Sequence, residues 1–216
     1  MPPIRLSGNV YGTLLNHRSA LRALGDQVNK PPYGGAPKAP VLYIKPRNTL
    51  AQSGDAVNLP ASVGELEIGA QIGIIIGKTT CRVTVDHALG SVAGYLIVND
   101  VSIPHPDYFR PAIRYKALDG FCPIGEAVAN RESIDPDALE IVTFVDGLRV
   151  QSSNTKDSVR SAAQLIQDVS DFMTLAPGDV LTLGAAAPAP RVRAGQTVRI
   201  EVDGLGNLSN RFVAAA

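Results

Sequence analysis

The stretch that decides the fold is Gly94–Glu126, which reads GYLIVNDVSIPHPDYFRPAIRYKALDGFCPIGE. An apolar run ends at Asp100, charged residues follow, and a second apolar run begins after Asp119. The cluster of basic residues between the two runs consists of Arg110, Arg114 and Lys116. Like charges beside strand-like sequence are either solvated loop residues or the lining of an anion-binding site. Both interpretations remain open from composition alone.

The rest of the chain has the punctuation of a mainly β protein. Its 20 glycines and 16 prolines separate short runs rich in Val, Ile, Leu and Thr, which is typical of strands joined by turns. Strands are predicted at residues 9–15, 41–44, 66–76, 93–98, 139–145, 148–151, 180–183, 197–202 and 208–213. Asp146-Gly147 between two apolar runs predicts a two-residue hairpin. Helices are predicted only at 85–89 and 158–173, the second from apolar residues at helical spacing.

Length and charge limit the classes of function. A chain of 216 residues with 45% hydrophobic composition is long enough for one domain with its own core, and we expect a single domain over 1–216. Twenty basic and twenty acidic residues cancel, so nucleic-acid or membrane-surface binding is not expected. Two cysteines, Cys81 and Cys122, are too few for a disulfide framework. With no apparent signal peptide, we expect a cytoplasmic protein.

Several motifs in this order resemble the fumarylacetoacetate hydrolase family. The segment around Asp100 matches a Gly-Tyr…Asn-Asp-x-Ser motif, and Lys116 begins a Lys-x-x-Asp-x-x-x-Pro-x-Gly motif. Further matching segments are Asp146-Gly147, Asn154-Thr155, LAPGDVLTLG at 175–184 and AGQTVRIEVDGLGNLSN at 194–210. The resemblance covers nearly the whole chain. It implies an α+β, mostly β fold, a mixed β-sandwich roll with few helices.

One branch of the family resembles this chain more closely, through LNHRSALRALG at 15–25, YIKPRNT at 43–49 and DGFCPIGE at 119–126. Its members act in 4-hydroxyphenylacetate catabolism and carry two similar halves, in tandem or as separate subunits. The resemblance implies a carboxy-lyase/isomerase. It would convert 5-oxopent-3-ene-1,2,5-tricarboxylate to 2-hydroxyhepta-2,4-dienedioate, or isomerise the latter to 2-oxohept-3-ene-1,7-dioate. The alternative is a non-catalytic partner subunit that scaffolds a metal-bearing paralogue.

The family resemblance also implies a site for Mg²⁺ or Mn²⁺, held by a Glu-x-Glu pair and an Asp. Hard cations require such oxygen ligands. Asp100 matches the Asp, but the family's usual spacing places Gly69 and Gln71 where the two glutamates would stand. Glu65 and Glu67 form such a pair four residues out of step, too far along a strand to substitute. We therefore expect a weak metal site at most.

The candidate site residues follow from the same resemblance. Lys116 would hold a carboxylate or stabilise an enolate, His17 would move a proton, and Asp119 would complete the catalytic group. Lys116 and His17 each have a structural alternative. Lys116 would be a surface cation paired with Asp119, and His17 would be a loop or helix-cap residue. The candidate substrate-binding residues are Arg18, Arg110, Arg114 and Thr155. The partners expected are a small keto-acid di- or tricarboxylate and either a second copy or a paralogous subunit.

Overall fold

The computed structural model describes residues 7–105, 112–126 and 131–215. It contains a seven-stranded sheet, a five-stranded sheet and a two-stranded ribbon. The larger sheet has the order β2 (Val41–Lys45), β1 (Val10–Leu14), β11 (Val180–Thr182), β6 (Ala70–Ile76), β7 (Val92–Asn99), β8 (Cys122–Ile124) and β3 (Leu50–Gln52). The smaller sheet has the order β10 (Leu148–Asn154), β9 (Glu140–Val145), β13 (Thr197–Val202), β14 (Gly206–Ala214) and β4 (Ala56–Leu59). The ribbon pairs β12 (Arg191–Val192) with β5 (Leu66–Glu67).

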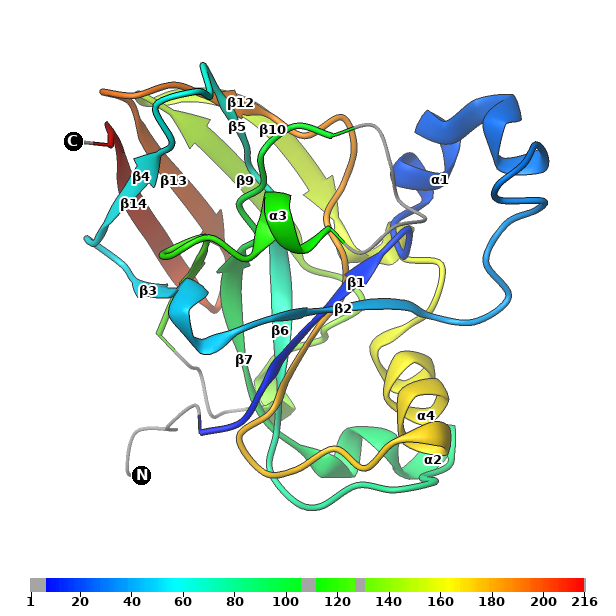
Figure 1. Cartoon of the computed structure of the whole chain (residues 1–216). Coiled ribbons are helices and arrows are strands. Elements are labelled where there is room, and N and C mark those ends of the chain that lie inside the picture. The colour runs from blue at the N-terminus through cyan, green and yellow to red at the C-terminus, as the bar shows by residue number, and fades with distance from the viewer. Residues whose placement is uncertain (1–6, 106–111, 127–130, 216) are drawn as a thin grey trace.

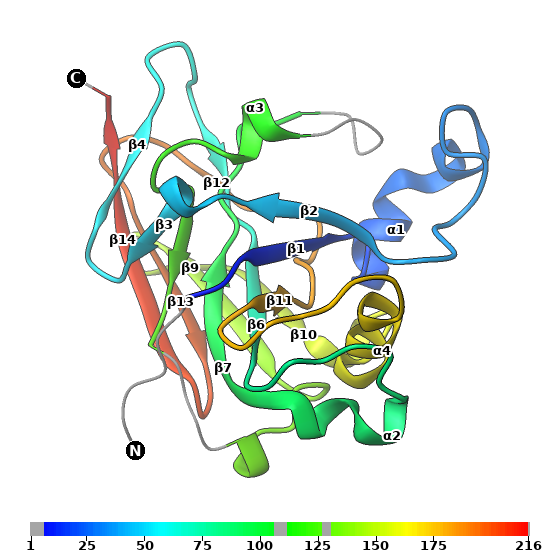
Figure 2. The same ribbon diagram turned by 60° about the horizontal axis from the view of Figure 1, so that its bottom comes forward.

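The sheets curl around a shared interior, which gives the expected mostly β roll (Figures 1 and 2). The α-helices are α1 (Arg18–Leu24), α2 (Val85–Ala88), α3 (Ile113–Lys116) and α4 (Ala162–Phe172). In both views α1, α2 and α4 lie on the side away from β14, and α3 lies over β2. None of the helices in the described part of the chain is long and apolar enough to span a membrane.

Strand β6 lies at the centre of the core, and all seven of its residues are buried. Successive side chains of a strand point to opposite faces. Ile72, Ile74 and Ile76 accordingly join the large core shared with the smaller sheet. Ile75 joins a second cluster on the other face, with Val180. Because both faces are covered, the sequence of β6 is apolar apart from Gln71 and lacks the alternation of a half-exposed strand.

The Asp146-Gly147 turn is confirmed as a hairpin. Both residues have positive φ, 50° and 81°, and β9 pairs with β10 directly across the turn, Val145 opposite Leu148. Two positive φ values are the signature of a type I′ turn, whose twist matches that of the strands. The Asp146 carboxylate accepts a hydrogen bond from the Thr197 backbone N–H at 2.9 Å, which ties the turn to β13.

Some elements differ from the expectation. The strand predicted at 66–76 is interrupted at residues 68–69, where β5 leaves the large sheet to pair with β12. The helix predicted at 158–173 begins only at Ala162, where the Ser161 side chain caps it by accepting from the Gln164 backbone N–H at 3.2 Å. Phe172, one of the apolar residues at helical spacing that predicted this helix, is 64% exposed. The short strands β3, β4, β8 and β12 and the helices α1 and α3 were not predicted, because each is too short for a periodic pattern.

Candidate active site

Asp100 follows the last residue of β7 and is the centre of a buried group of charges. Lys116 on α3 places Nζ 2.5 Å from its Oδ2, and Lys45 at the end of β2 places Nζ 2.8 Å from its Oδ1. The hydroxyl of Tyr43 donates a short hydrogen bond to Oδ2. Asp100 is 5% exposed and Lys45 3%. Three segments far apart in sequence therefore meet at one carboxylate.

The local structure of β1 and β2 explains how Tyr43 and Lys45 reach that carboxylate. They are two residues apart on β2, so their side chains lie on the same face of the sheet. Gly12 lies opposite Tyr43 in the β1–β2 register. A Cβ at Gly12 would lie 2.0 Å from the phenol ring, so only glycine leaves room for the ring to cross β1.

The electrostatics of the group leave one net positive charge. Burial alone would raise the pKa of Asp100, but the charges of Lys116 and Lys45 outweigh it and hold that pKa well below its usual range. Burial lowers the pKa of Lys45, opposed by the charge of Asp100. Burial and then the Asp100 charge raise the pKa of Tyr43, so its phenol remains a neutral donor. With one carboxylate and two ammonium groups, the formal charge of the group is +1.

This group lies at the floor of a cavity of about 340 Å³. Tyr43, Asp100 and Lys116 line the cavity, and the Lys116 side chain is 10% exposed against 1% for Lys45. The remaining polar lining residues in the described part of the chain are Thr13, Glu67, Ser102, His105 and Arg191. Much of the wall is small and apolar and includes Ala20, Ala23 and the segment 185–189. The cavity combines a cationic floor with poorly solvating walls.

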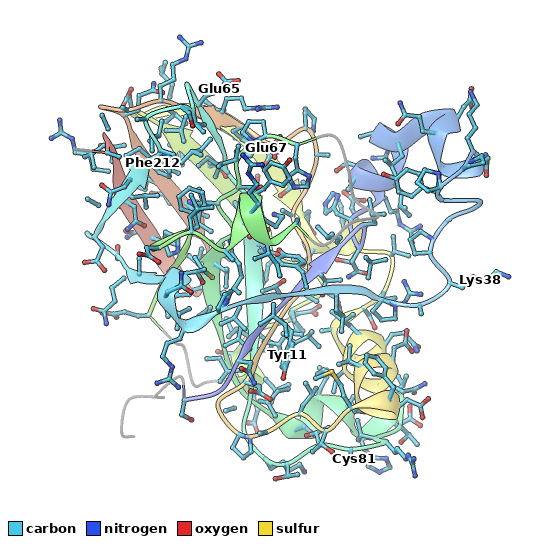
Figure 3. All side chains as sticks on the ribbon, in the orientation of Figure 1. Tyr11, Lys38, Glu65, Glu67, Cys81 and Phe212 are labelled. Carbon is cyan, nitrogen blue, oxygen red and sulfur yellow. The ribbon has the colours of Figure 1, made fainter. Side chains whose placement is uncertain are left out.

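Glu67 is a site residue that the sequence reasoning set aside. It lines the cavity because the chain at Glu67 bridges to Ser102, just after Asp100. In Figure 3 Glu67 lies over the interior of the molecule, whereas Glu65 lies farther out. Arg191 binds Glu67 at 3.0 Å. Burial raises the pKa of Glu67, opposed by the charges of Arg191 and Lys116.

The positions expected to hold metal ligands have other roles. A Cβ at Gly69 would lie 2.5 Å from the Asp100 backbone oxygen, so the chain leaves no room for a longer side chain there. Gln71 is 1% exposed. Its Oε1 accepts from the Gly184 backbone N–H at 2.8 Å, and its side chain also hydrogen-bonds Tyr43. Within the described ranges, no group of three or more His, Cys, Asp or Glu residues is arranged to hold a metal. One carboxylate already bound by two ammonium groups does not fit a hard divalent cation.

The structure does not bring His17 or Asp119 to the cavity lining. His17 is buried and caps α1, where Nδ1 accepts from the Ser19 backbone N–H at 3.2 Å. Burial lowers the pKa of His17, opposed by the backbone of Asn154. Asp119 is exposed and accepts from Asn48 Nδ2 at 2.6 Å, not from Lys116. The helix-cap interpretation of His17 is the one that the geometry supports.

Three of the predicted substrate-binding residues, Arg18, Arg114 and Thr155, are also apart from the cavity lining. Arg18 and Arg114 are exposed on α1 and α3. Thr155 is buried, and its hydroxyl accepts from the Leu139 backbone N–H at 2.8 Å, a structural contact. Arg110 lies outside the described residues. Of the residues proposed from sequence, Asp100 and Lys116 are the two that line this cavity together.

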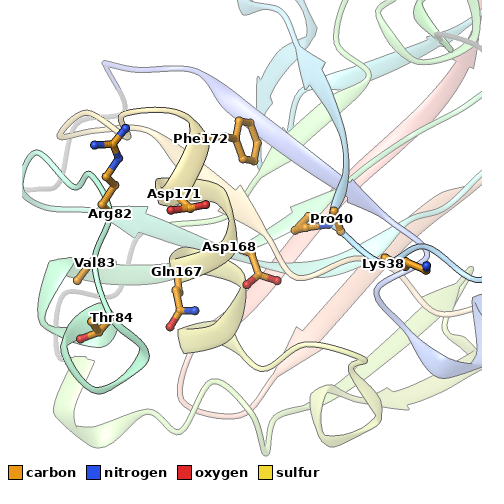
Figure 4. Close-up of a pocket in the computed structure, with 10 residues that line it drawn as sticks. Lys38, Pro40, Arg82, Val83, Thr84, Gln167, Asp168, Asp171 and Phe172 are labelled. Carbon is orange, nitrogen blue, oxygen red and sulfur yellow. The ribbon is translucent and has the colours of Figure 1, made fainter.

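A larger hollow of about 500 Å³ lies elsewhere, between α4, residues 38–40 and residues 82–84 (Figure 4). Two of its polar side chains make structural contacts. Asp168 pairs with Arg160 at 2.8 Å, and Gln167 accepts from the Val85 backbone N–H at 2.8 Å. These two contacts hold α4 in place, whereas the charges at Asp100 are buried together at one carboxylate.

Comparison with known proteins places the fold in a family. Residues 9–213 match the family described as fumarylacetoacetate (FAA) hydrolase C-terminal. The chain belongs to the fumarylacetoacetate hydrolase family. It is 41% identical over 209 residues to the 4-hydroxyphenylacetate degradation bifunctional isomerase/decarboxylase of Salmonella dublin, covering 97% of this chain and 48% of that protein. It is 39% identical to the homoprotocatechuate catabolism bifunctional isomerase/decarboxylase of Escherichia coli, covering 96% and 48%.

Solved members of the fumarylacetoacetate hydrolase family have the same fold. The 5-carboxymethyl-2-hydroxymuconate delta-isomerase of Mycobacterium smegmatis superposes with a TM-score of 0.83 at 29% identity, covering 100% of this chain and 81% of that one. Fumarylpyruvate hydrolase of Pseudomonas aeruginosa, solved with Mn²⁺ and pyruvate, gives 0.82 at 25% identity, covering 96% and 90%. The chain spans about half the length of the two bifunctional enzymes it matches.

Proposed function

We propose that this chain is a decarboxylase/isomerase of 4-hydroxyphenylacetate catabolism. Its substrate would be 5-oxopent-3-ene-1,2,5-tricarboxylate, and its product 2-hydroxyhepta-2,4-dienedioate or the isomer 2-oxohept-3-ene-1,7-dioate. The observation that carries the proposal is the buried Lys116–Asp100 pair, 2.5 Å apart, at the floor of a cavity with a net positive charge. The similarity to the two bifunctional enzymes, along nearly the whole chain, supports the choice of substrate.

The chemistry needs a group that stabilises an extended enolate. When the C–C bond to the departing carboxylate breaks, its electron pair moves through the double bond to the 2-oxo oxygen, and CO₂ leaves. The enolate oxygen then takes a proton to give the hydroxydiene. Lys116 is placed to stabilise that oxygen by a charge-assisted hydrogen bond. The alanine-rich wall would solvate the departing carboxylate poorly, which favours its loss.

Isomerisation passes through the same enolate, which now forms from the hydroxydiene. The hydroxyl of the diene loses its proton, and the far end of the conjugated system gains one, which leaves the 2-oxo-3-ene. Glu67 is half-buried on the cavity wall, and burial raises its pKa, which favours a role in proton exchange. We assign it this role in place of His17, which the chain uses as a helix cap.

A divalent cation commonly serves enzymes of this family, and Mn²⁺ with pyruvate is named in one solved neighbour. A bound cation would chelate a 2-oxo acid and accept charge from the enolate. We propose that the present chain works without one, since its donor set consists of Asp100 with Gly69 and Gln71 at the other two positions. No step above uses a metal.

The alternative is a partner subunit. A specific observation favours it: the closed backbone at Gly69 would fit a half whose paralogue carries the metal. In that case the chain would assemble with a second, metal-bearing subunit, and the homodimer would be inactive. The two proposals differ in whether this chain turns over substrate by itself.

The experiment is a turnover assay of the purified chain with the tricarboxylate, with and without Mg²⁺, and after adding a metal-bearing paralogue. We expect CO₂ release by the chain alone. Lys116→Ala should lower kcat by about 10²- to 10³-fold, whereas Lys30→Ala, an exposed lysine on the surface, should leave it unchanged. Activity seen only in the mixture would establish the scaffold instead, and equal kcat for the Lys116 variant would remove that residue from the reaction.

A further inference from the structure

Lys45 is a fully buried ammonium that lies behind the cavity lining and has no role in the reaction proposed above. Its side chain is 1% exposed. Nζ lies 2.8 Å from Asp100 Oδ1 and donates hydrogen bonds to two backbone oxygens, of Val101 at 3.0 Å and Lys116 at 2.6 Å. A buried ammonium is tolerated only when oxygens replace its water. The three oxygens around Nζ take the place of the water that would hydrate an exposed ammonium.

The charge of Lys45 changes what Lys116 can do. Without Lys45, the Lys116–Asp100 pair would carry no net charge, because the Asp100 carboxylate would balance the Lys116 ammonium. With the Lys45 ammonium beside Asp100 Oδ1, the three side chains together carry a net positive charge. Lys116 lines the cavity, so an anion in the cavity would meet that charge. The ion pairs at the entrance of the cavity add no net charge within the described residues: Arg191 pairs with Glu67 at 3.0 Å and with Glu65 at 3.5 Å, and Arg193 pairs with Glu65 at 3.7 Å.

We propose that Lys45 is the built-in cation of this site. It is a positioning residue that keeps the floor at a net charge of +1, so that the carboxylate of a 2-oxo acid binds beside Lys116 with no divalent metal. The inference rests on the proposed function and specifies how the substrate is held: one anionic group of the substrate binds at the cavity floor. Its tests use binding, so they do not depend on which reaction the chain catalyses.

The first test titrates the full chain with pyruvate, a 2-oxo acid with a single carboxylate, by isothermal titration calorimetry. We expect the same Kd in EDTA and in excess Mg²⁺. Loss of binding in EDTA would overturn the inference, because a metal would then supply the charge. This measurement needs no variant and stands even if every substitution at the floor impairs folding.

The second test is a charge exchange. Lys45→Met should weaken pyruvate binding by about 10- to 50-fold, the Coulomb effect of one charge some 7 Å away at an effective dielectric constant near 20. Adding Asp100→Asn restores a net charge of +1 and should recover most of that loss. Lys38→Met, the same substitution at an exposed site away from the cavity (Figure 3), is the matched control.

The double variant separates charge from architecture. A merely structural role for Lys45 predicts that the second substitution adds damage, so a double variant that binds no better than Lys45→Met would overturn the inference. Circular dichroism melts confirm that each variant is folded. Pyruvate binding in EDTA without turnover of the tricarboxylate would refute the proposed function and leave the role of Lys45 standing.

Discussion

Replacing Asp100 by asparagine would remove the carboxylate that lies between two buried lysines. The Asp100 side chain is 6% exposed and that of Lys45 is 1%, so the ammonium of Lys45 cannot recover its lost partner from water. Removing one partner of a buried ion pair costs about 3–5 kcal/mol. We expect Asp100→Asn to lower the free energy of unfolding by that amount at pH 6, and the loss to depend on pH.

The sign of the pH dependence follows from Lys45. Burial already lowers its pKa in the folded protein, and the charge of Asp100 opposes that fall. Without Asp100 the pKa falls further, so the neutral form of Lys45 becomes more populated in the folded variant, while Lys45 stays protonated in the unfolded chain. The unfolded state then binds up to one more proton, and the stability of the variant rises with pH by up to about 1.4 kcal/mol per unit. In the wild type, with Asp100 in place, Lys45 contributes no such slope below its own folded pKa.

The assay is urea unfolding followed by circular dichroism at pH 6, 7, 8 and 9, with the wild type measured in parallel. The quantity of interest is the difference in unfolding free energy, which should shrink as pH rises. Asp119→Asn, at an exposed aspartate, should cost less than about 0.5 kcal/mol at every pH. A deficit for Asp100→Asn below about 1 kcal/mol, or one that is equal at pH 6 and pH 9, would refute the buried-charge reasoning.

Two further predictions concern packing and thiol chemistry. Gly69→Ala would place Cβ 2.5 Å from the Asp100 backbone oxygen and should cost about 1–3 kcal/mol; Gly64→Ala, where nothing lies within 4 Å of the added atom, should cost far less, and equal melting temperatures would contradict the close approach. Of the two thiols, the exposed Cys81 should react with Ellman's reagent in the native protein, while Cys122, which is buried and whose pKa is raised to about 12, should react only in denaturant. If two thiols per chain reacted rapidly in the folded protein, the prediction for Cys122 would be wrong.

Much of the fold could be read from the sequence because its signals are local. The apolar run of β6, the Asp146-Gly147 turn and the stripe of α4 each specify a structure within a few residues. The strand predicted through 68–69 failed for a non-local reason: the break comes from pairing with β12, more than 100 residues away. The exposure of Phe172 has a similar origin, since helical spacing does not state where the neighbouring layer ends.

The candidate site was harder to predict than the fold. Asp100 and Lys116 lie 16 residues apart in two neighbouring motifs, so a resemblance could pair them. Lys45 and Glu67 reach the same cavity through sheet register and through a bridge to Ser102. Their sequence context, a lysine ending an apolar run and a glutamate out of step with a motif, carries no sign of that convergence. The available signal for Lys45 was the YIKPRNT segment at 43–49, which resembles the family but does not show that its lysine contacts Asp100.

The energetics of the floor bear on whether the chain is an enzyme or a scaffold. A scaffold gains nothing from burying two ammonium groups and a carboxylate, because apolar residues of similar volume would be as stable or more so. The Gln71 side chain hydrogen-bonds Gly184 and Tyr43. These contacts fix both the wall of the cavity and the hydroxyl that donates to Asp100. Side chains with costly burial that converge on a cavity are what a binding site for an anion requires. The positions without carboxylates therefore describe a site with different chemistry more than a site that has been lost.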